Sequence, residues 1–190
     1  MQWVGFLAAA ALALFLADRE GMFGTRPAPA GSDYERYHGK TFRVARVVDG
    51  DTIDIAAPDR GKPTTRVRLW GVDTPETKRR DTPVQHFGPE ATAFTKSACQ
   101  DRQVKIELEP HTTRGTYGRL LAYVILPDGT MLNRELVRQG FGYADPRFPH
   151  RLKPEFLSLQ NEARQQRRGL WKDVRRKDLP SYWRDKLSLP

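Results

Sequence analysis

Two carboxylates flank a single glycine in the stretch VVDGDTIDI, which spans residues 47–55. Asp49 and Asp51 lie between apolar and β-branched residues, and a DG pair in such a setting is a strong signal for a two-residue hairpin turn. Either the pair only turns the chain, or one carboxylate also binds a ligand. A calcium loop of the EF-hand type is excluded, because counting from Asp49 puts Asp54 at the glycine position and Arg60 at the glutamate position. A metal ion at this turn would therefore need ligands from other segments.

A second segment, RVRLWGVDTPET at residues 66–77, crowds an arginine, two carboxylates and a threonine around one proline. If Val67 and Leu69 point inward from a strand, Arg68 lies on the opposite face and need not belong to the core. An exposed arginine on a strand is usually only solvated, so this segment alone does not define a site. Its candidate functional residues are Arg68, Asp73, Thr74 and Glu76.

A third segment, TYGRLLAY at residues 116–123, places an arginine directly after a flexible point in the chain. Gly118 permits a bend and Arg119 opens the next strand, which is an ordinary turn in most proteins. Tyr117 precedes this pair. Each of the three segments thus has an ordinary structural interpretation when it is taken alone.

A scaffold must bring these segments together. Short β-branched or aromatic runs bounded by turn residues predict five strands, and prolines and glycines at segment ends predict about three helices. Three strands precede the first helix, which favours an α+β fold, mainly a five-stranded β barrel with packed helices, over a βαβ alternation. The expected strands are 41–48, 51–55, 65–72, 104–109 and 119–126, and the expected helices are 88–99, 132–140 and 154–169.

Composition narrows the class of protein. The 190 residues suit one domain with some length left for tails or an anchor, and a formal charge of +9 favours polyanions or anionic lipid as partners. Cys99 is the only cysteine, which excludes an intrachain disulfide and a zinc site built on several thiolates. The four histidines lack the short spacings of a metal motif. Nothing in the composition indicates an oligomer.

Residues 3–17, WVGFLAAAALALFLA, form a continuous apolar run. The run is shorter than the roughly 20 residues of a typical membrane span and matches a signal-peptide core in length. No clear cleavage site follows it, which favours a retained anchor over a secretory signal; a buried core helix is the alternative. We therefore expect a membrane-anchored or secreted, periplasmic protein. The predicted organisation is a signal or anchor at 1–18, a flexible linker at 19–39, the domain at 40–172 and a charged tail at 173–190.

Five motifs in fixed order carry a family resemblance. They are VVDGDT, RLWGVDTPETK, FGPEATAFTK, YGRLLAYV and LVRQG, and they fall within roughly 100 residues. In this combination the chain resembles the staphylococcal nuclease, or thermonuclease, family from about Thr41 to Trp171. The resemblance implies an OB-fold barrel and a Ca²⁺-dependent phosphodiesterase. It also implies cleavage of DNA and RNA, preferably single-stranded, to products that end in a 3′-phosphate.

The resemblance also implies roles for individual residues. It makes Asp51 and Asp73 the carboxylate ligands of one Ca²⁺ ion, with the main-chain carbonyl of Thr74 as a further ligand. Calcium accepts such oxygen ligands with loose geometry. It makes Glu76 the residue that activates or orients the attacking water. Arg68 and Arg119 become the arginines that bind the scissile phosphate, a task that suits the paired donors of a guanidinium.

Two tyrosines are further candidates for substrate binding. The resemblance places Tyr117 near the phosphate, and Tyr143 could stack on a base, with packing in the core or on the surface as an equal alternative. Gly115 stands where the best-known member has an aspartate, which puts ion affinity and substrate preference in question.

Two other functions stay open at this point. A non-catalytic nucleic-acid-binding module of the same fold is one, although such modules typically lack the arginines or carboxylates that this chain keeps. A lipid-surface protein is the other, and it explains residues 3–17 but not the VDTPE motif.

Overall fold

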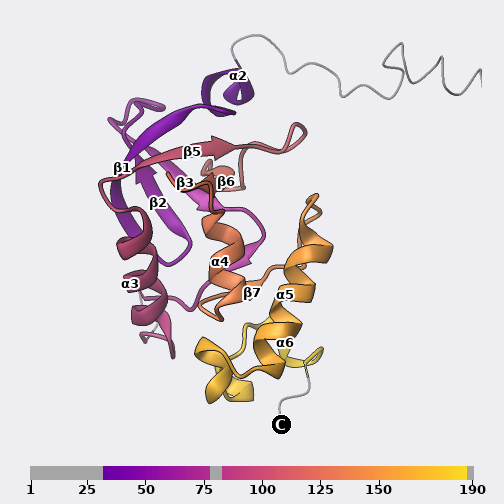
Figure 1. The fold of residues 1–190 in the computed structure, drawn as a ribbon. Coiled ribbons are helices and arrows are strands. Elements are labelled where there is room, and N and C mark those ends of the chain that lie inside the picture. The colour runs from indigo at the N-terminus through magenta and orange to yellow at the C-terminus, as the bar shows by residue number, and fades with distance from the viewer. Residues whose placement is uncertain (1–31, 78–82, 188–190) are drawn as a thin grey trace, which may run out of the picture. The chain divides into compact units, whose positions relative to one another are not determined.

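Five strands close into a barrel in the order β1-β2-β3-β6-β5 (Figure 1). Strands β3 and β6 pair in parallel, and the other neighbours in the barrel are antiparallel. This confirms the predicted five-stranded OB-type barrel. The strands are β1 (Thr41–Asp49), β2 (Thr52–Ile55), β3 (Thr65–Leu69), β5 (Gln103–Glu107) and β6 (Leu120–Ile125).

The computed structural model describes residues 32–77 and 83–187. The apolar run at 3–17 and most of the predicted linker lie outside these residues. Within the described part of the chain, no helix is both long and apolar enough to cross a membrane.

The barrel interior follows from the alternation of side chains along each strand. In β3, Val67 and Leu69 are at most 1% exposed, while Arg66 and Arg68 point to the other face. The inward residues of β3 join those of β2 and β6, including Ile53 and Leu120, in one apolar core. Burial of these side chains is the main stabilising contribution to the fold. The same alternation leaves Arg68 free to take part in a polar site.

Three helices pack against the barrel close to where the sequence predicts them. They are α3 (Gly88–Cys99), α4 (Leu132–Arg138) and α5 (Lys153–Gln165). Helix α4 lies between the barrel and α5 (Figure 1). Its buried Asn133 accepts the N–H of Val124 at 2.9 Å and donates to the carbonyl of Trp70 at 3.0 Å, which joins β6 to the end of β3.

A two-stranded sheet was not anticipated from the sequence. Strand β4 (Val72–Asp73) pairs with β7 (Tyr143–Ala144), so that Val72 lies opposite Ala144 and Asp73 opposite Tyr143. Strands of two residues are too short for periodicity to reveal them.

The folded part of the chain extends beyond both predicted domain limits. It begins before residue 40 with α2 (Asp33–Tyr37), whose Tyr37 is fully buried and hydrogen-bonded to Thr65 at 3.0 Å. It continues past residue 172 through η1 (Gly169–Lys172), η2 (Arg176–Asp178) and α6 (Ser181–Arg184). Residues 173–187, which we call the C-terminal segment, bury Leu179 and Trp183 against α5 and η1. Residues 173–190 were predicted to be a charged tail because these few apolar residues lie among many charged ones.

Candidate functional site

The turn between β1 and β2 is closed locally and packed against the second segment. Asp49 accepts the N–H of Asp51 at 3.3 Å, which shapes the turn. Thr95 of α3 donates its hydroxyl to the carbonyl of Gly50 at 2.6 Å. A Cβ at Gly50 would come within 2.7 Å of the Thr74 hydroxyl oxygen. Glycine between the two carboxylates therefore permits Thr74 to approach the turn.

The Asp51 carboxylate points away from the turn and is held by three donors. Its Oδ2 accepts the Thr74 N–H at 2.7 Å and the Thr74 hydroxyl at 3.1 Å, and Oδ1 accepts the Thr52 hydroxyl at 3.0 Å. Asp51 is 5% exposed. Asp51 and Thr74, which are distant in sequence, are thus joined directly.

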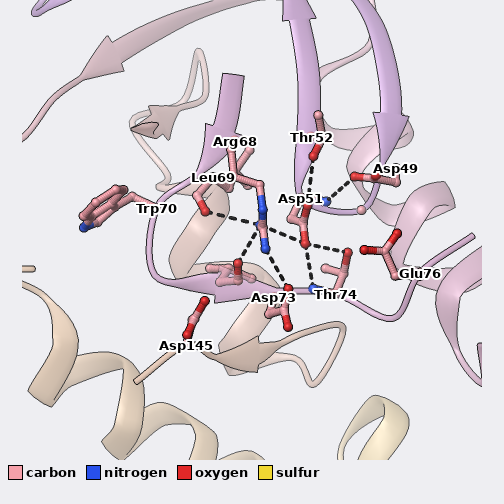
Figure 2. A network of polar contacts seen from close by, with 12 residues as sticks. Asp49, Asp51, Thr52, Arg68, Leu69, Trp70, Asp73, Thr74, Glu76 and Asp145 are labelled. Atoms are coloured by element: carbon pink, nitrogen blue, oxygen red, sulfur yellow. Dashed lines mark hydrogen bonds and ion pairs between the residues drawn. The ribbon is translucent and has the colours of Figure 1, made fainter. Parts of the chain in front are cut away.

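Arg68 bridges the two carboxylates that the sequence analysis proposes as metal ligands (Figure 2). Its Nη1 lies 2.8 Å from Oδ2 of Asp51, and its Nη2 lies 2.7 Å from Oδ1 of Asp73. It also donates to the carbonyl of Val72 at 2.6 Å. We call Arg68, Asp51 and Asp73 the site cluster.

Burial sets the electrostatics of the site cluster. It raises the pKa of Asp51 and of Asp73 above the ordinary value, because the loss of water disfavours the charged form more than Arg68 restores it. Burial alone would lower the pKa of Arg68, but the negative charges of Asp51 and Asp73 offset this and raise it. Among the described residues, Arg68 is the one guanidinium that contacts both carboxylates, of which Asp51 is buried and Asp73 partly buried.

Glu76 and Arg119 line the same hollow as the site cluster, with a volume of about 710 Å³. Figure 2 shows Glu76 beside Thr74, with its carboxylate turned toward the turn that carries Asp49. Every residue proposed for catalysis or metal binding therefore borders one space. These residues are Asp51, Arg68, Asp73, Thr74, Glu76 and Arg119.

Arg119 carries a donor without an acceptor. Its Nε is buried and has no hydrogen-bond partner among the described residues. Burial lowers the pKa of Arg119, and the nearby positive charge of Arg68 adds to this effect. A buried, unsatisfied cationic donor is costly in the free protein. An anionic oxygen in the hollow would satisfy it, which is the chemistry of a phosphate-binding arginine.

The two candidate tyrosines differ in accessibility. Tyr117 is 85% exposed, beside Arg119. Tyr143 is 2% exposed, and its ring packs edge to face against Trp171 at 5.4 Å. Its ring face is thus not available for stacking on a base. Of the two alternatives for Tyr143, packing in the core agrees with the structure. Phe148 lies in the loop between β7 and α5 and is 54% exposed. The sequence analysis did not identify this aromatic residue as a candidate.

Phe148 borders a second pocket next to the hollow, with a volume of about 370 Å³. Arg68, Arg119 and Arg147 line both spaces. The second pocket also presents apolar and aromatic side chains suited to a nucleobase: Trp70, Tyr117, Leu121 and Phe148.

Two more residues reach the site cluster from parts of the chain that the sequence analysis did not consider. The Tyr182 hydroxyl donates to Oδ2 of Asp73 at 2.8 Å, and Arg147 lies 3.5 Å from the same oxygen. Arg147 is held in place by Asp145 at 2.7 Å. No motif marks these residues; the one available signal was the pair of aromatic residues in an otherwise charged C-terminal segment.

Comparison with known proteins places this architecture. Residues 66–173 match the family model described as staphylococcal nuclease homologue. A thermonuclease of Staphylococcus intermedius is 40% identical over 136 residues, which cover 70% of this chain and 77% of that protein. A thermonuclease of Staphylococcus hyicus is 35% identical over 70% of this chain and 76% of its own length. An uncharacterized endonuclease of Escherichia coli is 37% identical over 70% of this chain and 77% of its own length. The chain therefore belongs to the staphylococcal nuclease family.

Proposed function

We propose that this protein is a Ca²⁺-dependent nuclease that hydrolyses phosphodiester bonds of DNA and RNA, preferably single-stranded, to products ending in a 3′-phosphate. Family membership and the names of the relatives support nuclease activity. The observation that carries the proposal is the single hollow bordered by the site cluster, Glu76 and Arg119.

The oxygen donors of the hollow fit a calcium ion. Asp51 and Asp73 supply two carboxylates that border the hollow, and calcium prefers carboxylate, carbonyl and water oxygens. In the described ranges, no group of three or more His, Cys, Asp or Glu side chains is arranged as a metal cluster. The family resemblance makes Asp51, Asp73 and the carbonyl of Thr74 the groups that would hold the ion, and all three residues border the hollow. Such a small protein ligand set leaves coordination positions for water and for a phosphate oxygen. When bound, calcium supplies charge stabilisation for the developing oxyanions and lowers the pKa of bound water.

The protein groups around this position divide the remaining work. Arg119 donates its unsatisfied guanidinium hydrogens to the phosphate oxygens, where negative charge grows in the transition state. Arg68 fixes the positions of the Asp51 and Asp73 carboxylates and borders the hollow. Glu76 accepts a proton from the attacking water or orients it. The bases of a single strand would stack on exposed aromatic side chains such as Tyr117 and Phe148, without regard to sequence.

A cleavage assay tests this proposal on the full chain. Labelled single-stranded DNA, duplex DNA and RNA are incubated with Ca²⁺ or with a chelator, and the ends of the products are identified by phosphatase treatment. We expect Glu76→Gln and Arg119→Gln each to lower the cleavage rate by about 10²–10³-fold. Arg43→Gln is the matched control, because Arg43 pairs with Asp101 on the barrel surface. We expect it to retain the wild-type rate.

Three results would each remove a different part of the proposal. Tight binding of DNA without cleavage would show a non-catalytic binding module. Equal rates for wild type, Glu76→Gln and Arg119→Gln would show that the catalytic residues are misassigned. Undiminished cleavage in the chelator would rule out dependence on calcium.

We also propose that residues 3–17 direct the protein to a membrane or out of the cytoplasm. The continuous apolar run supports this, because it suits lipid better than a half-exposed helix. Cell fractionation together with the mass of the mature protein tests it. An intact protein found only in the soluble cytoplasmic fraction would contradict it.

A further inference from the structure

The C-terminal segment is anchored to the strand pair that carries Asp73. Trp183 donates its indole N–H to the carbonyl of Ala144 in β7 at 3.0 Å. Strand β7 pairs with β4, and β4 ends at Asp73. Leu179 is 1% exposed and belongs to the same apolar cluster as Trp171. The segment is thus part of the folded domain and lies next to a proposed metal ligand.

The C-terminal segment also forms one wall of the hollow. The hollow has Asp51 and Glu76 on its other sides. A second link joins the segment to the loop beyond Glu76, because Nε2 of His86 lies 3.1 Å from Oδ1 of Asp173. The wall is made of Lys177, Asp178, Leu179, Pro180, Ser181, Tyr182 and Arg184.

Tyr182 is the residue of this wall that contacts the site cluster. Its hydroxyl donates to Oδ2 of Asp73 at 2.8 Å, while Arg68 donates to Oδ1 at 2.7 Å. Both carboxylate oxygens of Asp73 are therefore fixed by residues that lie far apart in the sequence. The Tyr182 ring lies under the guanidinium of Arg147, with 4.2 Å between its central carbon and the ring centroid. This stacking restrains the ring and aims the hydroxyl.

The Tyr182 hydroxyl has a single hydrogen, which it donates to Oδ2 of Asp73. A protonated phenol beside a carboxylate can only donate its hydrogen to that carboxylate. A carboxylate oxygen that accepts one hydrogen bond keeps a second lone pair for a metal ion.

We propose that Tyr182 is a positioning residue for Asp73, and that the C-terminal segment completes the metal-binding side of the site. This inference rests on the proposed function, in which Asp73 is a calcium ligand. A carboxylate already held in one orientation loses less freedom when it binds an ion, and hydrogen-bonded partners of metal ligands commonly contribute 10–100-fold to affinity. The packing of residues 173–187 is thereby linked to calcium affinity.

Calcium titration of the full chain by calorimetry tests the proposal without reference to catalysis. Tyr182→Phe removes only the hydroxyl and keeps the ring under Arg147. We expect it to raise the calcium dissociation constant by about 10–100-fold. The cleavage rate of this variant should rise back toward wild type at saturating calcium, because the groups that contact substrate are unchanged.

Tyr37→Phe is the matched control. It also removes one buried tyrosine hydroxyl, which bonds to Thr65 on the barrel, outside the hollow. We expect a comparable loss of stability on urea unfolding but an unchanged calcium dissociation constant. Trp183→Phe removes the bond to Ala144, and we expect it to weaken calcium binding in the same direction as Tyr182→Phe.

The outcomes separate this inference from the proposed function. If the wild-type chain neither binds calcium nor cleaves nucleic acid, the proposed function fails and the inference with it. If wild type does both but Tyr182→Phe binds calcium equally well, the inference alone fails. Tighter calcium binding by Tyr182→Phe would also overturn it, because the hydroxyl would then compete with the ion.

Discussion

Two clusters in this molecule have the same composition, one arginine between two aspartates, but opposite electrostatics. In the site cluster, Arg68 bridges Asp51 and Asp73. In the other, which we call the frame cluster, Arg114 lies 2.6 Å from Asp33 and 2.7 Å from Asp59. The frame cluster joins α2 to the loops that lead out of β2 and into β6.

The pKa shifts of the aspartates show how the two clusters differ. The hydrogen bond from Arg114 lowers the pKa of Asp33, so the folded frame cluster stabilises the charged carboxylate. Burial raises the pKa of Asp51 and Asp73, so the folded site cluster disfavours charge on them. The frame cluster therefore stabilises the fold. In the site cluster, the folded protein does not fully stabilise the charged carboxylates, and a bound cation would stabilise them.

The frame cluster also supports the site directly. Arg114 donates to the carbonyl of Gly118 at 2.9 Å, and Gly115 donates its N–H to the carbonyl of Arg119 at 2.9 Å. The loop that presents Tyr117 and Arg119 is therefore held at its base by a satisfied ion pair.

The largest expected effect comes from removing the arginine of either cluster. Arg68→Gln and Arg114→Gln each remove the guanidinium that contacts both carboxylates of a cluster, and we expect each to lower the free energy of unfolding by about 3–5 kcal/mol. The two variants should differ in how much calcium stabilises them. Calcium can replace the missing positive charge between Asp51 and Asp73, so it should stabilise Arg68→Gln more than wild type. For Arg114→Gln, the calcium increment should equal that of wild type.

Urea unfolding with and without calcium measures these increments. Equal calcium increments for the two variants would remove the distinction between the clusters. It would mean that the site cluster is only another structural ion pair.

A smaller effect is expected for Asp33→Asn. The substitution removes a charged acceptor from Arg114, which we expect to cost about 1.5–3 kcal/mol at pH 7. Because the folded-state pKa of Asp33 is lowered, its contribution is present above the unfolded value of 3.8 and is lost as the pH falls through the folded value. The stability gap between wild type and Asp33→Asn should therefore narrow below about pH 4. Urea unfolding at pH 7, 5 and 3 checks this, and a constant gap would contradict it.

The proposed site residues that lie on regular elements border one hollow, as the sequence motifs led us to expect. Arg68 and Arg119 lie on or beside strands whose alternation is plain, and family motifs surround them and Asp73. The barrel and its three longer helices could be predicted for the same reason: apolar periodicity and turn residues agree along these segments.

The missed features depend on contacts between distant, weakly patterned segments. Asp33, Tyr182 and Arg147 act through a few long-range hydrogen bonds, which leave no period in the sequence. The sequence left Tyr143 open between base stacking and core packing, because sequence cannot show which face of a two-residue strand is covered. The irregular C-terminal segment gains its structure from the apolar residues that it buries, not from local propensity.

Substitutions of Tyr117 and Tyr143 test which of the two tyrosines stacks on a base, and we expect a moderate effect on KM. Tyr117→Ala should raise the KM for single-stranded DNA about tenfold, because it removes an exposed ring worth about 1–3 kcal/mol in stacking. Tyr143→Leu removes the ring from a position that is 2% exposed and packed against Trp171, and should leave KM unchanged. Steady-state kinetics with a defined oligonucleotide measures both variants, and urea unfolding checks that Tyr143→Leu is folded. A larger KM effect from folded Tyr143→Leu than from Tyr117→Ala would restore Tyr143 as the substrate-binding residue.

The smallest stability effect should come from Asp73→Asn, although the substitution resembles Asp33→Asn chemically. The amide oxygen can still accept from Arg68, and the amide hydrogens can donate to the Tyr182 oxygen, so the contacts are conserved in number. The weaker hydrogen bonds and the lost attraction of Arg147, 3.5 Å away, are offset because the substitution removes a charge that burial disfavours. We expect the free energy of unfolding without calcium to change by less than about 1 kcal/mol in either direction. Calcium-dependent cleavage should nevertheless fall by at least about 10²-fold. A loss of stability as large as that of Asp33→Asn would show that Asp73 serves the fold, and the contrast between the two clusters would not hold.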